Sequence, residues 1–80
     1  MQTIKNTLPS FRETRFGYES TSRDLEHTYV ITYNGIDYDV THYWSQNPQG
    51  ELIGRTASPA HLAREHARKL ARKHYADLQR

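Results

Sequence analysis

The dipeptide Asn34-Gly35, set between two β-rich runs, is the feature that most restricts how this 80-residue chain can fold. Residues 27–33 and 36–44 are rich in Val, Ile, Thr, Tyr and Trp, the side chains that favour strands. Asn-Gly readily accepts the two positive φ angles of a type I′ turn. The sequence therefore predicts a β-hairpin with a two-residue turn, and this turn sets the register of the strands.

The predicted register gives the hairpin one apolar and one polar face. The apolar face pairs Tyr33 with Ile36, Ile31 with Tyr38, Tyr29 with Val40 and His27 with His42, and Trp44 continues it. The polar face pairs Thr32 with Asp37, Val30 with Asp39 and Thr28 with Thr41. Such a sheet needs a cover on one side only, and Tyr43 and Tyr18 are the aromatic residues expected outside that cover.

Residues 47–78 are expected to supply a third strand and the cover. A turn at residues 47–50 leads to residues 51–56, which we expect to form a short third antiparallel strand at the sheet edge. Ser58-Pro59 then fits a helix N-cap and first helical residue, and nothing breaks a helix before Leu78. The apolar stripe of this helix consists of Ala63, Ala67, Leu70, Ala71, His74 and Leu78. Its small side chains allow the helix to lie close to the sheet.

The fold class predicted from these elements is α+β. We expect a small three-stranded antiparallel sheet, with or without an extra N-terminal strand, covered on one face by a single C-terminal helix. Residues 27–80 form this β-β-β-α domain, and residues 1–26 are expected to be irregular or flexible, with at most one short strand near residues 11–18. An alternative is that the helix pairs with its own copy in a homodimer, because the core is thin.

Composition excludes several classes of protein. Leu, Ile, Val and Phe make up 14 of the 80 residues, below the ~20% that warns of disorder, but the net charge of only +2 and the six Tyr favour a folded domain. The chain has no Cys, so disulfides and thiolate chemistry are excluded. No apolar run can span a bilayer and the first ten residues lack the centre of a signal peptide, so we expect a cytoplasmic protein without a membrane partner.

The positive charge is concentrated near the C-terminus. Residues 59–80 carry a net charge of +4, whereas residues 1–58 carry −2. The Ala-Arg pair recurs every four residues, so the arginines form a slowly winding ladder beside the alanine stripe, with two lysines next to it. The predicted binding residues are therefore Arg64, Arg68, Lys69, Arg72 and Lys73.

Such a ladder can neutralise successive phosphates, and arginine suits bidentate contacts. The sequence thus predicts a small nucleic-acid-binding or regulatory module that uses a basic C-terminal helix. The alternative is a non-enzymatic protein-interaction module, such as a phage- or mobile-element-encoded inhibitor of a host protein complex, whose basic helix docks on an acidic protein surface. A solvated helix face without a partner also accounts for these cations, because Arg and Lys are good helix formers.

The histidines and carboxylates predict neither a metal site nor catalysis. His61 and His66 are five residues apart, about 140° around a helix, and do not share a face. His27 and His42 lack a third ligand, and we expect them to form a partly buried, pH-sensitive contact. The carboxylates at the exposed hairpin tip have no cavity that would separate their pKa values. We therefore expect no enzyme activity, no metal and no cofactor.

In architecture, the order of three strands and an alanine-rich helix in residues 28–78 resembles the latter part of a double-stranded-RNA-binding domain and the DNA-binding domain of tyrosine recombinases. The resemblance does not extend to the binding residues. Double-stranded-RNA-binding domains carry a lysine cluster at the start of the final helix, where residues 58–63 of this chain contain no lysine. The recombinase domains read DNA with the sheet, whose outward face here is predicted to carry Asp37 and Asp39. Membership in either family does not follow.

Overall fold

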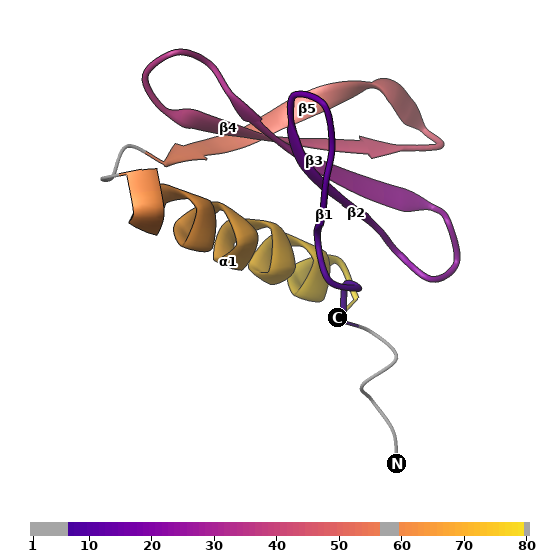
Figure 1. Cartoon of the computed structure of the whole chain (residues 1–80). Coiled ribbons are helices and arrows are strands. Elements are labelled where there is room, and N and C mark those ends of the chain that lie inside the picture. The colour runs from indigo at the N-terminus through magenta and orange to yellow at the C-terminus, as the bar shows by residue number, and fades with distance from the viewer. Residues whose placement is uncertain (1–6, 57–59, 80) are drawn as a thin grey trace.

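A computed structural model describes residues 7–56 and 60–79, with the side chains of the helix from residue 62 onward. One five-stranded antiparallel sheet and one C-terminal helix form two layers, with the helix lying along one face of the sheet (Figure 1). The elements are β1 (Arg12–Glu13), β2 (Gly17–Thr21), β3 (His27–Tyr33), β4 (Tyr38–Trp44), β5 (Asn47–Thr56) and α1 (Ala60–Leu78). The strands lie in the sheet in chain order. Within the described ranges, no helix is long and apolar enough to cross a membrane.

The α+β class with a single C-terminal helix is confirmed, but the sheet has five strands and the prediction of three was wrong. Both additional strands lie between residues 12 and 21, where at most one short strand was expected. Gly17 permits the pairing of β2 with β3, because a Cβ there would lie 1.9 Å from the carbonyl oxygen of Ile31. Strand β2 was not expected because the inward-facing side of this stretch carries two buried serines, Ser20 within the strand and Ser22 just after it. Serines give no alternation of apolar and polar residues, which is the sequence signal of a half-buried strand.

The hairpin of β3 and β4 forms, but its register is shifted by two residues from the prediction. Tyr33 pairs with Tyr38, Ile31 with Val40, Tyr29 with His42 and His27 with Trp44. Because side chains alternate with a period of two, this shift leaves every paired residue on its predicted face. It nevertheless moves Ile36 to the tip of the hairpin, where 84% of the residue is exposed, and leaves Tyr33 55% exposed.

The shift arises because Asn34 uses its side chain, and not a positive φ angle, to shape the turn. The backbone N–H of Asn34 donates to the carbonyl oxygen of Asp37 at 2.9 Å, so the two central residues are Gly35 and Ile36. The Asn34 side-chain oxygen accepts hydrogen bonds from the backbone N–H groups of Ile36 and Asp37. Gly35 takes the positive φ angle of 103°, which glycine adopts without a steric penalty.

Strand β5 is longer than predicted and begins earlier. Asn47 already pairs with Trp44, so the connecting turn consists of residues 45–46 and not of residues 47–50. Two register shifts against β4 accommodate extra residues as β-bulges, and Gly50 in this strand has a φ of 86°. The predicted edge position of the strand is confirmed.

Helix α1 places three alanines of the predicted stripe in the core. Ala63, Ala67 and Ala71 are at most 1% exposed, and Tyr29, Ile31 and Val40 on the sheet are fully buried. Leu78 was expected in the stripe but is 46% exposed, and Tyr75 is buried instead. The Ser58-Pro59 cap lies outside the described residues.

Within one chain the alanine stripe packs against its own sheet, so it is not available to a second helix in this arrangement. The alternative in which the helix pairs with its own copy would have to use another face of the helix.

Ala67 tests this packing, because the residue is fully buried between helix and sheet. We expect Ala67→Glu to cost several kcal/mol, comparable to the whole stability of a domain of this size, since it places a carboxylate against apolar side chains. Thermal denaturation followed by circular dichroism should show no cooperative transition. Ala76→Glu, on the exposed side of the same helix, is the matched control and should unfold like the wild type. A native-like Ala67→Glu protein would contradict the packing.

Candidate functional site

The five predicted binding residues lie on α1 and wind about halfway around it from Arg64 to Lys73, and we call them the basic strip: Arg64, Arg68, Lys69, Arg72 and Lys73. At 1.5 Å rise per residue the strip is about 14 Å long. Its members differ in exposure, because Arg64 and Arg68 are half-buried whereas the other three are exposed. The strip therefore has an inner row, Arg64 and Arg68, that faces the protein, and an outer row, Lys69, Arg72 and Lys73, that faces solvent.

The inner row packs on an aromatic side chain of β2. Arg64 Nη1 donates a hydrogen bond to the hydroxyl oxygen of Tyr18 at 2.7 Å, and this bond raises the pKa of Arg64 above its usual value. The guanidinium carbon of Arg68 lies 5.2 Å from the centre of the Tyr18 ring, and that of Arg64 lies 5.8 Å from it. Both distances are in the range of cation–π interactions. These arginines thus connect the helix to β2.

Arg72 makes a similar contact further along the helix. Its guanidinium carbon lies 5.7 Å from the centre of the Phe11 ring, in the segment that precedes β1. Sequence analysis identified the cations but not this aromatic support, because Tyr18 was expected on the outer face. That expectation was wrong, since Tyr18 pairs with Ile31 and therefore shares the helix-covered face.

The outer row is the most accessible positive charge of the strip. Lys69 is exposed, and the side chain of Lys73 is 75% exposed. Lys73 Nζ lies 3.4 Å from a carboxylate oxygen of Asp77, and Arg68 lies 3.8 Å from Glu65. Exposed ion pairs of this kind contribute at most about 1 kcal/mol, so they compete weakly with a polyanion. The lysines can therefore contact a negatively charged partner without disturbing the core.

A second cluster of polar and aromatic side chains lies between the sheet and the C-terminal part of the helix, next to residues 74 and 75. It consists of His27, His42 and His74 together with Tyr29, Trp44 and Tyr75, and we call it the imidazole cluster. His27 Nδ1 and His42 Nε2 share a hydrogen bond of 2.9 Å, which confirms the contact predicted for this pair. The Tyr29 hydroxyl and His74 Nδ1 share another, of 2.8 Å.

Burial dominates the electrostatics of this cluster. His42 is only 3% exposed, and its burial, together with His74 and His27 nearby, lowers its pKa to about 4. Burial likewise raises the pKa of the Tyr29 phenol. In the described part of the chain no three His, Asp or Glu side chains are placed to hold a metal ion. The imidazole cluster is thus a hydrogen-bonded group of side chains at the edge of the core, and His42 is its fully buried histidine.

Comparison with protein-family models, with curated proteins and with solved structures finds no significant match to this chain.

His42 gives the protein a defined pH dependence. The pKa of this imidazole is about 6.5 in the unfolded chain and about 4 in the folded one, so the unfolded state binds the proton first as the pH falls. We therefore expect the free energy of unfolding to decrease from about pH 6.5 downward and to level off below about pH 4, with a total loss of about 3 kcal/mol.

Urea unfolding at a series of pH values measures this loss, and the same series on His42→Phe isolates it from other titrating groups. The phenyl ring preserves the stacking on Tyr29 but cannot be protonated. The difference in stability between the two proteins should shift in favour of the variant as the pH falls. If the stabilities of the two proteins changed in parallel with pH, the lowered pKa of His42 would be contradicted.

Proposed function

We propose that this protein is a small non-enzymatic module that binds the phosphate backbone of nucleic acid through the basic strip. The observation that supports the proposal is the division of the strip into two rows. The half-buried Arg64 and Arg68 pack against Tyr18, and the exposed Lys69, Arg72 and Lys73 carry the accessible charge. A guanidinium stacked through its face still presents its N–H groups in the ring plane to phosphate oxygens.

The same geometry favours binding that is independent of base sequence. The ring of Tyr18 is occupied by two guanidinium groups, so it is not free to stack on a nucleic-acid base. Contacts from Lys and Arg to phosphates position a protein on nucleic acid but carry no direct sequence information. We therefore infer electrostatic binding with a strong dependence on salt. The absence of cysteine suits the reducing cytoplasm, where we place this activity.

A protein partner is the second candidate, and exposed apolar side chains favour it. Phe16, between β1 and β2, and Ile36, between β3 and β4, are 73% and 84% exposed. Large exposed apolar residues are common at protein interfaces. In this case the basic strip would steer the chain toward an acidic surface, as in an inhibitor of a host complex encoded by a phage or mobile element.

The double variant Lys69→Glu/Lys73→Glu tests the proposed function. Lysines are chosen because Arg68 and Arg72 pack on rings, so that replacing them would also disturb the fold. We expect the variant to remain folded and to bind duplex DNA or RNA at least about tenfold more weakly. The slope of log K against log salt should become shallower by about two units, since two phosphate contacts are lost.

The matched control is Arg15→Glu, compared with the single variant Lys69→Glu, because it changes the net charge equally at an exposed loop position outside the strip. Fluorescence anisotropy over 50–300 mM salt should show this control binding more tightly than the single lysine variant. Equal loss in both variants would mean that only net charge matters. Undetectable binding of the wild type at low salt would exclude nucleic acid and leave the protein partner.

A further inference from the structure

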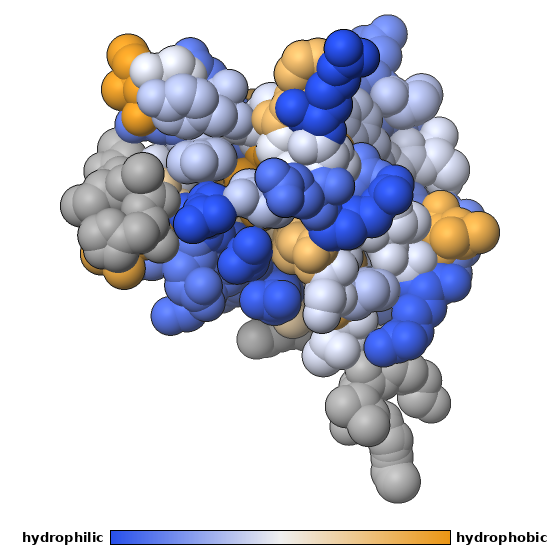
Figure 2. Space-filling view, viewed as in Figure 1, coloured by the Kyte–Doolittle hydropathy of each residue, from blue (hydrophilic) through white to orange (hydrophobic). Residues whose placement is uncertain are grey.

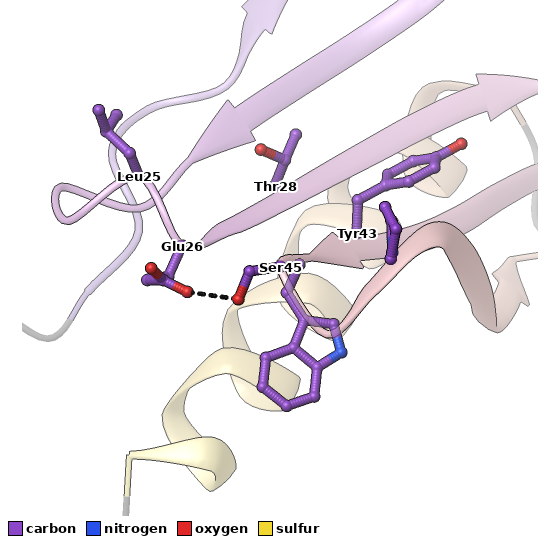
Figure 3. A pocket seen from close by; sticks show the side chains of 7 residues that line it. Leu25, Glu26, Thr28, Tyr43 and Ser45 are labelled. Atoms are coloured by element: carbon purple, nitrogen blue, oxygen red, sulfur yellow. Dashed lines mark hydrogen bonds between the residues drawn. The ribbon is translucent and has the colours of Figure 1, made fainter.

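A shallow groove of about 320 Å³ opens at the end of the sheet where the β2–β3 loop meets the β4–β5 turn (Figure 3). Its lining consists of Leu25, Glu26, Thr28, Tyr43, Trp44, Ser45 and Pro48. Thr28 and Tyr43 are cross-strand partners and alternate with the buried residues Tyr29 and His42, so they point away from the helix. The groove therefore opens at the end of the sheet, with Thr28 and Tyr43 on the outer face and Trp44, a member of the imidazole cluster, on the helix side.

One wall of the groove is a leucine held in an unfavourable conformation. Leu25 has a φ of 65°, the left-handed region that residues other than glycine rarely adopt, and it is 79% exposed. Hydrogen bonds hold the loop around Leu25 in place. Ser22 is 1% exposed, its hydroxyl donates to Asp24 Oδ1 at 2.6 Å, and its carbonyl accepts the backbone N–H of Leu25. The fold thus keeps a large apolar side chain in water at the cost of backbone strain.

The opposite wall is Tyr43, and a second residue with positive φ shapes it. Gly50 has a φ of 86°, and a Cβ at this position would lie 2.4 Å from the ring of Tyr43. Between the walls, the hydroxyl of Ser45 donates to the carboxylate of Glu26 at 2.8 Å and joins the two loops (Figure 3). Both walls of the groove therefore depend on a residue with a positive φ angle, Leu25 on one side and Gly50 on the other.

The outer sheet face next to the groove carries mostly uncharged side chains: Thr21, Thr28, Val30, Thr32, Thr41, Tyr43 and Leu52. Two charged residues among them are paired, Glu19 opposite Val30 with Arg12, and Asp39 with Arg55. Such a face can be desolvated without leaving these charges unpaired.

We propose that the outer face binds a second copy of this chain in a two-fold symmetric dimer, with Leu25 of each copy entering the groove of the other. An exposed knob directly beside an apolar groove is self-complementary, as a two-fold interface requires.

The size of the face sets the expected strength. Strands about 4.8 Å apart with about 3.3 Å per residue give the five-stranded face an area of roughly 500 Å² per copy. Two such faces bury about 1,000 Å², near the lower limit for specific interfaces. The dimer should therefore be weak and dependent on concentration. It does not use the basic strip, so the proposal goes beyond the proposed function and can fail independently of it.

Leu25→Asn tests the proposal while preserving the loop. Asparagine tolerates positive φ better than leucine, so the variant should unfold at a temperature equal to or above that of the wild type. Sedimentation velocity between 10 µM and 1 mM should show the wild type moving toward twice its mass of 9.4 kDa. The Leu25→Asn protein should dimerise at least about tenfold more weakly.

Ile36→Asn is the matched control, because Ile36 is also exposed in a loop but lies at the other end of the sheet. It should dimerise like the wild type, as should Lys69→Glu/Lys73→Glu. A wild-type chain that stays monomeric at 1 mM would overturn the proposal. So would a dimer that survives Leu25→Asn or is lost in Ile36→Asn.

Discussion

The close approach of α1 to the sheet is the contact on which the rest of the molecule depends. Ala63, Ala67 and Ala71 are almost completely buried, so the helix backbone itself lies near the sheet. Gly54 in β5 extends this approach, because a Cβ there would lie 2.5 Å from the Leu70 side chain. The chain has few large aliphatic side chains to fill a wide space between helix and sheet. The core is filled because the two layers lie close together. A short distance between the layers lets Tyr29 and its neighbours on the sheet be fully buried under small side chains.

The position of the helix also explains the second role of the arginines. Helix α1 packs on β3, β4 and β5, so the inner face of β2 needs another cover. Part of that cover is the N-terminal segment, where Leu8 is 6% exposed and the Pro9 carbonyl accepts a hydrogen bond from Ser20. The remaining cover is the aliphatic and planar part of the arginines above Tyr18. Figure 2 shows that the face seen there is mostly hydrophilic, with separate apolar areas.

The faces of the sheet were predictable from sequence, but its register was not. Alternation determines which side chains face the helix, and a slip of two residues preserves alternation, so Ile31 and Val40 reached the core although their predicted partners were wrong. The turn that sets the register depends on whether Asn34 uses its backbone or its side chain. Strand propensity does not distinguish these two choices.

The candidate site shows the same limit. Spacing along one helix placed the cations of the basic strip, because helix periodicity is regular. Their contact with Tyr18 depends on β2, a strand whose buried serines carry no apolar signal. The groove beside Leu25 depends on positive φ angles at Leu25 and Gly50, and no pattern of hydrophobicity reports a backbone angle at a leucine. Features that depend on local periodicity could therefore be predicted from the sequence, whereas contacts between segments that are distant in the sequence could not.

The two layers separate the two proposed surfaces from each other. The basic strip lies on the helix layer, and the mostly uncharged face next to the groove lies on the other side of the sheet. A partner on one surface therefore leaves the other accessible, and in the proposed dimer the two basic strips would lie on the outside of a four-layer assembly. Because the two strips of such a dimer would point away from each other, they would contact separate segments of nucleic acid, and linkage adds to affinity only where both contacts can form at once. The proposed binding through one strip therefore does not depend on the proposed dimer.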